Sequence, residues 1–212
     1  VGVEAPGEHR VPQPVPERRD QVGQPLGERR ELPYSNHGGP TWNPGRLAEV
    51  LRVAAREAGW AREMPSGEGL GIAGHFTFGG YAAWVAHVKV DRDGKLTVRR
   101  LTGAVDCGLA VNPNGIRAQM EGGACDALST ALGEELTIEG GRHRETNFHQ
   151  YRLMRIDQAP RSIDVHIVQG ADEPAGLGEP PVPPLAPALT NAIFAATGRR
   201  IRHLPVGDQL RS

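Results

Sequence analysis

The sequence predicts an α+β fold, in which mixed or antiparallel strands carry packed helices. Apolar residues recur at helical spacing in three segments, and they alternate with other residues in the segments between these. The resulting order is helix, hairpin, helix, strands, helix, which is typical of this class. Because the 212 residues include 28 glycines and 18 prolines, we expect turns and loops to make up much of the remaining chain.

The first forty residues differ in composition from the rest. Residues 1–40 are rich in proline and charge, contain Tyr34 as their only aromatic residue, and show no period of 2 or 3.6. Such a segment buries too little apolar surface to offset the entropy lost on ordering. We therefore expect 1–40 to be a disordered or unrelated segment, followed by a domain at 41–206 and a tail at 207–212.

A first helix is expected to begin after Asn43, because asparagine is a favourable N-cap and Pro44 suits the first helical position. Gly59 is a suitable residue to end it. The apolar residues of this segment lie on one helical face: Leu47, Val50, Leu51, Ala54 and Ala58.

A β-hairpin is expected after this helix. Residues 67–74 are spaced by glycines and are interpreted as a loop. Alternating apolar residues then predict a strand over 81–90, and Asp-Arg-Asp-Gly at 91–94 is a turn signal. Leu96 and Val98 restart the alternation and predict the second strand of the hairpin.

A second helix is expected to begin after Asn112, with Pro113 at its first position and apolar residues at helical spacing as far as Ala131. Gly122 and Gly123 weaken its middle by about 1 kcal/mol each relative to alanine. A close approach of another backbone, or of a ligand, is one reason to tolerate two glycines there.

The last third of the sequence predicts strands, a loop and a final helix. A short strand is expected at 136–138, followed by an alternating strand at 162–168. Residues 175–184 form a loop rich in glycine and proline. The final helix follows this loop, and Gly198 is its expected C-cap.

The loop at 175–184 contains the first candidate for chemistry, Glu179. Gly176 and Gly178 allow neighbouring atoms to approach the main chain closely, and the four prolines that follow restrict it. A carboxylate held rigidly within hydrogen-bond range is what a general base requires. The plainer interpretation is a solvated turn residue.

The second candidate is Gln119, which precedes Gly122 and Gly123 in the second helix. A side-chain amide both donates and accepts hydrogen bonds, so it can recognise the edge of a heterocycle. The plainer interpretation is an exposed helix residue. A third segment, residues 104–113, is interpreted as an ordinary strand–turn–helix junction, with a loop beneath a ligand as the alternative.

Composition excludes several classes of function. The 24 basic and 25 acidic residues give no reason to expect nucleic acid as a partner. No segment approaches the roughly 18 apolar residues of a membrane span. Cys107 and Cys125 form no metal or redox motif, and the histidines show no zinc pattern. The absence of an export signal favours the cytoplasm.

Seven short motifs, taken in order, resemble the C-terminal part of the molybdopterin-binding subunit of the xanthine dehydrogenase/aldehyde oxidase family. The β subunit of isoquinoline 1-oxidoreductase-like enzymes is the most similar in character. The resemblance extends over about 42–206, so the fold would be a partial molybdopterin-binding domain. The motifs include Val105-Asp106-Cys107-Gly108, Gln119-Met120-Glu121-Gly122-Gly123, Asn147-Phe148-His149-Gln150-Tyr151 and Gly178-Glu179-Pro180-Pro181.

This resemblance implies part of a molybdenum hydroxylase that oxidises an aldehyde or N-heterocycle with water as the oxygen source. Glu179 would be the base that deprotonates the hydroxyl ligand of molybdenum, with hydride passing to the sulfido ligand. Gln119 would contact the pterin, beside Gly122, Gly123 and Gly178. The cofactor would be molybdenum-molybdopterin, with the cytosine dinucleotide form as one alternative, and no protein ligand to the metal is assigned.

The resemblance also implies partners. They are a 2Fe–2S electron-transfer subunit and an upstream molybdopterin-binding half that supplies further cofactor-binding loops, none of which is found in this sequence. We therefore expect the chain to be inactive alone. The alternative is a non-catalytic truncated fragment or partner-binding module. The resemblance adds the periplasm to the cytoplasm as an expected compartment.

Overall fold

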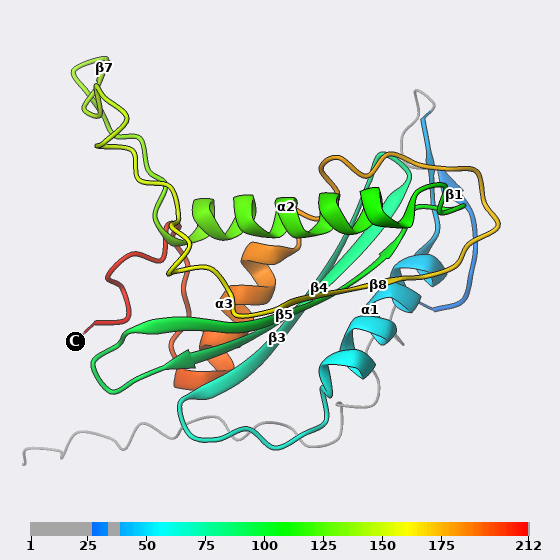
Figure 1. The fold of residues 1–212 in the computed structure, drawn as a ribbon, viewed down its shortest axis with the longest axis horizontal. Coiled ribbons are helices and arrows are strands. Elements are labelled where there is room, and N and C mark those ends of the chain that lie inside the picture. The colour runs from blue at the N-terminus through cyan, green and yellow to red at the C-terminus, as the bar shows by residue number, and fades with distance from the viewer. Residues whose placement is uncertain (1–26, 34–38, 212) are drawn as a thin grey trace, which may run out of the picture.

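The computed structural model describes residues 27–33 and 39–211, so most of the segment expected to be disordered lies outside the described residues. At its centre is a four-stranded sheet in the order β3 (Glu68–Thr77), β4 (Gly80–Val90), β5 (Leu96–Asp106) and β8 (Ile163–Ile167) (Figure 1). The first three strands are antiparallel and β8 is parallel to β5. The predicted α+β class with a mixed sheet is confirmed.

In the described part of the chain, three helices cover the two faces of this sheet (Figure 1). Helix α1 (Pro44–Ala58) packs on one face, whereas α2 (Pro113–Leu132) and α3 (Leu185–Thr197) pack on the other. The alternation of β4 explains this arrangement, because successive side chains point to opposite faces. Tyr81, Ala83 and Val85 join the core under α1, and Ala82, Trp84 and Ala86 join the core under α2 and α3.

The predicted helix ends are confirmed. The Asn43 side chain accepts hydrogen bonds from the main-chain N–H groups of Gly45 and Arg46, and the Asn112 side chain accepts one from Gly115. Gly59 and Gly198 end α1 and α3 with φ of 65° and 73°, in the left-handed region that glycine adopts readily.

The prediction of a loop at 67–74 was wrong, because most of this segment belongs to β3. Two glycines inside β3, Gly69 and Gly71, serve packing instead of turning. A Cβ on Gly71 would lie 2.1 Å from Ala192 N, and one on Gly69 would lie 2.4 Å from Ala192 O. Helix α3 therefore rests directly on the main chain of β3, and the missing side chains are what permits this approach.

Within the described residues, two very short strands precede α1. Leu32–Pro33 (β1) pairs antiparallel with Thr41–Trp42 (β2), so part of the segment expected to be disordered is paired. Glu31 accepts hydrogen bonds from the side chains of Thr41 and Asn43, and these hydrogen bonds lower the pKa of its carboxyl.

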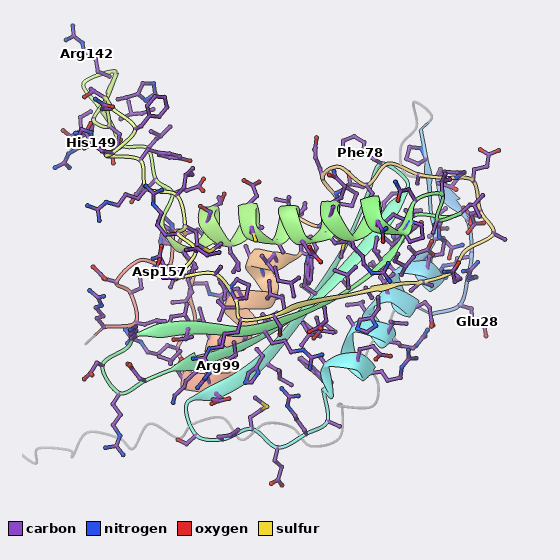
Figure 2. All side chains as sticks on the ribbon, viewed as in Figure 1. Glu28, Phe78, Arg99, Arg142, His149 and Asp157 are labelled. Carbon is purple, nitrogen blue, oxygen red and sulfur yellow. The ribbon has the colours of Figure 1, made fainter. Side chains whose placement is uncertain are left out.

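A thin arm projects from the body beyond the C-terminal end of α2. It comprises residues 134–158 and includes the hairpin of β6 (Ile138–Glu139) and β7 (Arg142–His143) (Figure 1). Figure 2 shows Arg142 and His149 at its far end, away from the sheet. The exposed apolar side chains of the arm are Leu136, Ile138, Phe148, Leu153 and Ile156. None of the helices in the described ranges is long and apolar enough to cross a membrane.

Candidate functional site

The loop that carries Glu179 connects β8 to α3 and is hydrogen-bonded near its start. Leu109 N donates to Asp172 O at 2.9 Å, and Ala175 N donates to Cys107 O at 2.9 Å. These bonds tie residues 172–175 to the chain that leaves β5. The main chain just upstream of Glu179 is therefore fixed to the central sheet.

The same loop is also anchored just after Glu179. The indole Nε1 of the buried Trp84 donates to Pro181 O at 2.8 Å. Val182 N donates to Glu179 O at 2.9 Å and forms a turn there. Because buried indole N–H groups need an acceptor, Trp84 holds the proline segment against β4.

The turn between β3 and β4 supports the underside of the loop. A Cβ on Gly80 would lie 2.8 Å from Gly176 O and 3.3 Å from Pro180 Cγ, so only glycine permits this contact. Phe78, labelled in Figure 2, stands at this turn with φ of 52° and an exposed side chain. Loop and hairpin thus form one packed unit.

Helix α2 lies on the other side of the loop and supplies Gln119. Its Nε2 lies 3.8 Å from the position that a Cβ on Gly178 would occupy, so Gln119 adjoins the residue before Glu179. A Cβ on Gly123 would lie 3.0 Å from Pro181 Cβ, whereas one on Gly122 would meet nothing within 4 Å. Gly123 therefore permits the close approach of the loop, and Gly122 faces open space.

Sequence-predicted site residues from two distant segments thus meet at one place. Gln119, Gly122, Gly178 and Glu179 are all exposed, and the buried Pro180 and Pro181 lie beneath them. An exposed amide and an exposed carboxylate near bare main chain offer hydrogen-bond donors and acceptors, which are the groups that can recognise the edge of a flat heterocycle such as a pterin. Within the described residues, no cluster of three or more His, Cys, Asp or Glu side chains suits a metal ion.

Sequence reasoning missed a buried ion pair beside this site. Arg46 Nη2 lies 2.6 Å from Asp106 Oδ1, and Arg46 Nε donates to Asp106 Oδ2 at 2.8 Å. Asp106 is fully buried at the end of β5. One signal was present, because Arg46 lies in the first turn of α1, where a positive charge opposes the helix dipole. Such a residue needs an anion nearby, but the sequence does not say which.

The two cysteines are free thiols. Cys107 is buried next to Asp106, and Cys125 is half-buried on α2. Burial, followed by the charge of Asp106, raises the pKa of the Cys107 thiol, and burial, followed by the charge of Glu121, raises that of Cys125. Both thiols are therefore less ready to ionise than a free cysteine, as expected of small packing residues.

Comparison with protein families shows which family the chain belongs to. Residues 46–160 match the model of the molybdopterin cofactor-binding domain. The chain belongs to this family. The molybdopterin-binding domain described above is therefore related to subunits of the xanthine dehydrogenase/aldehyde oxidase family, as its motifs indicated.

Two curated relatives show the extent of this similarity. The membrane-bound aldehyde dehydrogenase of Gluconacetobacter polyoxogenes, whose name specifies pyrroloquinoline quinone, is 38% identical over 78% of this chain. The isoquinoline 1-oxidoreductase subunit β of Brevundimonas diminuta is 34% identical over 78% of this chain. The chain spans 22% of the length of each relative.

A solved structure shows the same fold. The aldehyde oxidoreductase of Desulfovibrio gigas superposes on 61% of this chain with a TM-score of 0.54 and 28% identity, and the superposition covers 15% of that enzyme. The molybdopterin-binding domain thus has its counterpart in one part of a much larger aldehyde oxidoreductase.

Proposed function

We propose that this chain forms part of a molybdenum hydroxylase and that Glu179 is its catalytic base. The observation that carries the proposal is that Gln119, far away in the sequence, lies beside Gly178, the residue before Glu179, and that both Gln119 and Glu179 are exposed. When bound, the molybdenum cofactor supplies the redox chemistry that amino-acid side chains lack. The substrate class is an aldehyde or an N-heterocycle, and water is the oxygen source.

Glu179 is suited to accept a proton because its main chain is anchored on both sides. The hydrogen bonds that join residues 172–175 to Cys107 and Leu109, just after β5, and the Trp84–Pro181 hydrogen bond fix the main chain on both sides of Glu179. General-base catalysis requires such placement, since the base must reach the reacting proton at hydrogen-bond distance.

Gln119, Gly122 and Gly178 would hold the pterin. The Gln119 amide offers both a donor and an acceptor, and the two glycines leave the main chain accessible. Gly123 would act indirectly, by allowing α2 and the loop of Glu179 to approach each other. The plain pterin and the cytosine dinucleotide form are alternatives that mass spectrometry of the released cofactor distinguishes.

The exposure of the proposed site supports the presence of partner subunits in the working enzyme. Most of the proposed cofactor contacts are exposed on this chain, so they would cover only one side of the cofactor. We propose that an upstream molybdopterin-binding half covers the other side and that a 2Fe–2S subunit removes the electrons. This chain matches only 22% of the length of each relative, so the relatives contain much further sequence that could correspond to such parts.

A second candidate is a partner-binding module without catalysis. It is favoured by the arm, which exposes large apolar side chains including Phe148 and Ile156. Exposed apolar patches are typical of interaction surfaces. The two candidates differ in whether Glu179 matters for turnover.

The test is to co-express the chain with the neighbouring reading frames and assay oxidation of aldehydes and N-heterocycles. Glu179→Gln should leave the metal content unchanged and lower turnover by about 10²–10⁴-fold, the range of general-base contributions. Glu173→Gln is a matched control, because Glu173 is exposed in the same loop. Full turnover in Glu179→Gln would exclude Glu179 as the base.

A further inference from the structure

We propose that Arg46 is a positioning residue for Glu179, acting through Asp106 and the start of the Glu179 loop. The inference rests on the proposed function in taking Glu179 as the base. The physical claim is separate from it: Arg46 and Asp106 hold residues 170–175 in place, and without this pair the upstream anchor of the loop loosens.

The ion pair has the geometry of a strong, specific contact. The guanidinium binds both oxygens of Asp106, at 2.6 and 2.8 Å, and its Cζ lies over the Tyr81 ring at 4.5 Å from the centroid. The Arg46 side chain is 11% exposed and that of Asp106 is 0% exposed. Burial alone would lower the pKa of Arg46, but the hydrogen bonds and charge of Asp106 outweigh it, and the pKa is raised.

Asp106 connects this pair to the loop through its own neighbours. Its Oδ1 accepts a hydrogen bond from Gly108 N at 3.0 Å, which fixes the turn that follows β5. Gly108 has φ of 71°, and a Cβ on it would lie 2.2 Å from Glu173 O. A Cβ on Gly170 would lie 3.2 Å from Asp106 Oδ1. The main chain of residues 170–173 therefore lies directly against Asp106 and its turn.

Arg46 also contacts the loop itself. Its Nε lies 3.6 Å from Asp172 Oδ2, so the guanidinium faces one buried and one half-exposed carboxylate. Asp172 O and Cys107 O are the acceptors of the two main-chain bonds that tie 172–175 to 107–109. The positively charged Arg46 side chain thus lies at the junction of α1, β5 and the loop.

The downstream anchor does not involve Arg46. Trp84 comes from the middle of β4, and its bond to Pro181 lies on the face of the sheet opposite α1. Loss of Arg46 should therefore free the main chain upstream of Glu179 while Pro181 stays in place. A positioning role therefore predicts loosening on the upstream side of Glu179 only, whereas general stabilisation of the fold predicts loosening on both sides.

Hydrogen–deuterium exchange of the full chain tests the proposal without cofactor or partner. Arg46→Met should speed exchange at the amides of Leu109 and Ala175 by about tenfold or more, while amides in the middle of β4 keep their rates. Arg46→Lys keeps the charge but loses the two-pronged contact, so it should give the same local pattern more weakly. The double variant Arg46→Met/Asp106→Leu avoids an unpaired buried charge and guards against simple unfolding.

In the assembled enzyme, Arg46→Lys should lower kcat and leave KM near its original value, because the proposed role of Arg46 is to hold the loop of Glu179 and not to bind the substrate. Unchanged exchange at Leu109 and Ala175 in all three variants would overturn the proposal, as would equal acceleration throughout β4. Local loosening without any effect on kcat, in an enzyme that Glu179→Gln does inactivate, would also overturn it. If Glu179→Gln has no effect, the proposed function fails, and the exchange data still decide whether Arg46 holds the loop.

Discussion

At the scale of single residues, the anchoring of the loop by Trp84 is directly testable. Trp84→Phe removes the hydrogen bond to Pro181 O and leaves a buried carbonyl without its donor. We expect a loss of about 1–3 kcal/mol in unfolding free energy, the cost of an unsatisfied buried polar group. Urea denaturation measures it. Trp60→Phe is the control, because Trp60 packs against the other core, under α1, and an equal loss there would contradict a specific role for the Pro181 bond.

The sequence identified the candidate residues of the site but not what holds them. Glu179 and Gln119 were found from short local motifs, and the structure brings their segments together. The Arg46–Asp106 pair was not found, because its partners are 60 residues apart and the position of Arg46 in the first turn of α1 does not say which anion it meets. Local patterns report side-chain chemistry, whereas ion pairs between distant elements depend on the assembled fold.

At the scale of elements, glycine positions give contrasting predictions. Gly71→Ala would place a Cβ 2.1 Å from Ala192 N, so β3 and α3 must move apart. We expect a loss of about 1–3 kcal/mol or more, as in other overpacked cores. Gly122→Ala meets nothing within 4 Å inside a helix, so it should stabilise the protein by up to about 1 kcal/mol.

Thermal unfolding of the two alanine variants measures this contrast. A Gly71→Ala protein as stable as the original would show that α3 does not rest on the main chain of β3. Gly122 faces the proposed pterin, so its variant also reports on cofactor loading. If Gly122→Ala makes the chain more stable but the complex binds less cofactor, the result would agree with Gly122 facing open space in α2 and with Gly122 contacting the pterin.

The helices were predictable from sequence because their signals are local. Caps at Asn43 and Asn112, C-terminal glycines and apolar spacing all lie within the segments they define. Strand β3 was not predictable, since its glycines look like those of a loop. The glycines are needed there because α3, which lies more than a hundred residues later in the chain, packs directly on the main chain of β3.

At the scale of the whole molecule, the arm carries the most exposed large apolar side chains of the described residues. Phe148 is 95% exposed and Ile156 is 93% exposed. We expect the chain made alone to self-associate through the arm, and Phe148→Ser/Ile156→Ser to reduce this association without changing the unfolding transition. Sedimentation velocity measures it.

Val111→Ser is the matched control for the arm variant. Val111 is 75% exposed just before α2, at the end of the helix away from the arm. The Val111→Ser variant should leave self-association unchanged. If Val111→Ser and the arm variant had the same effect, the association would reflect general surface apolarity and not the arm.

The molybdenum content of the purified protein, alone and in complex with its co-expressed partners, tests the central claim most directly. We predict little metal in the chain alone, because the proposed site would cover only one side of the cofactor, and near-stoichiometric molybdenum in the complex. A complex that turns over substrate with no molybdenum would contradict the account. Release of a quinone from such a complex would instead favour the cofactor named for the Gluconacetobacter relative.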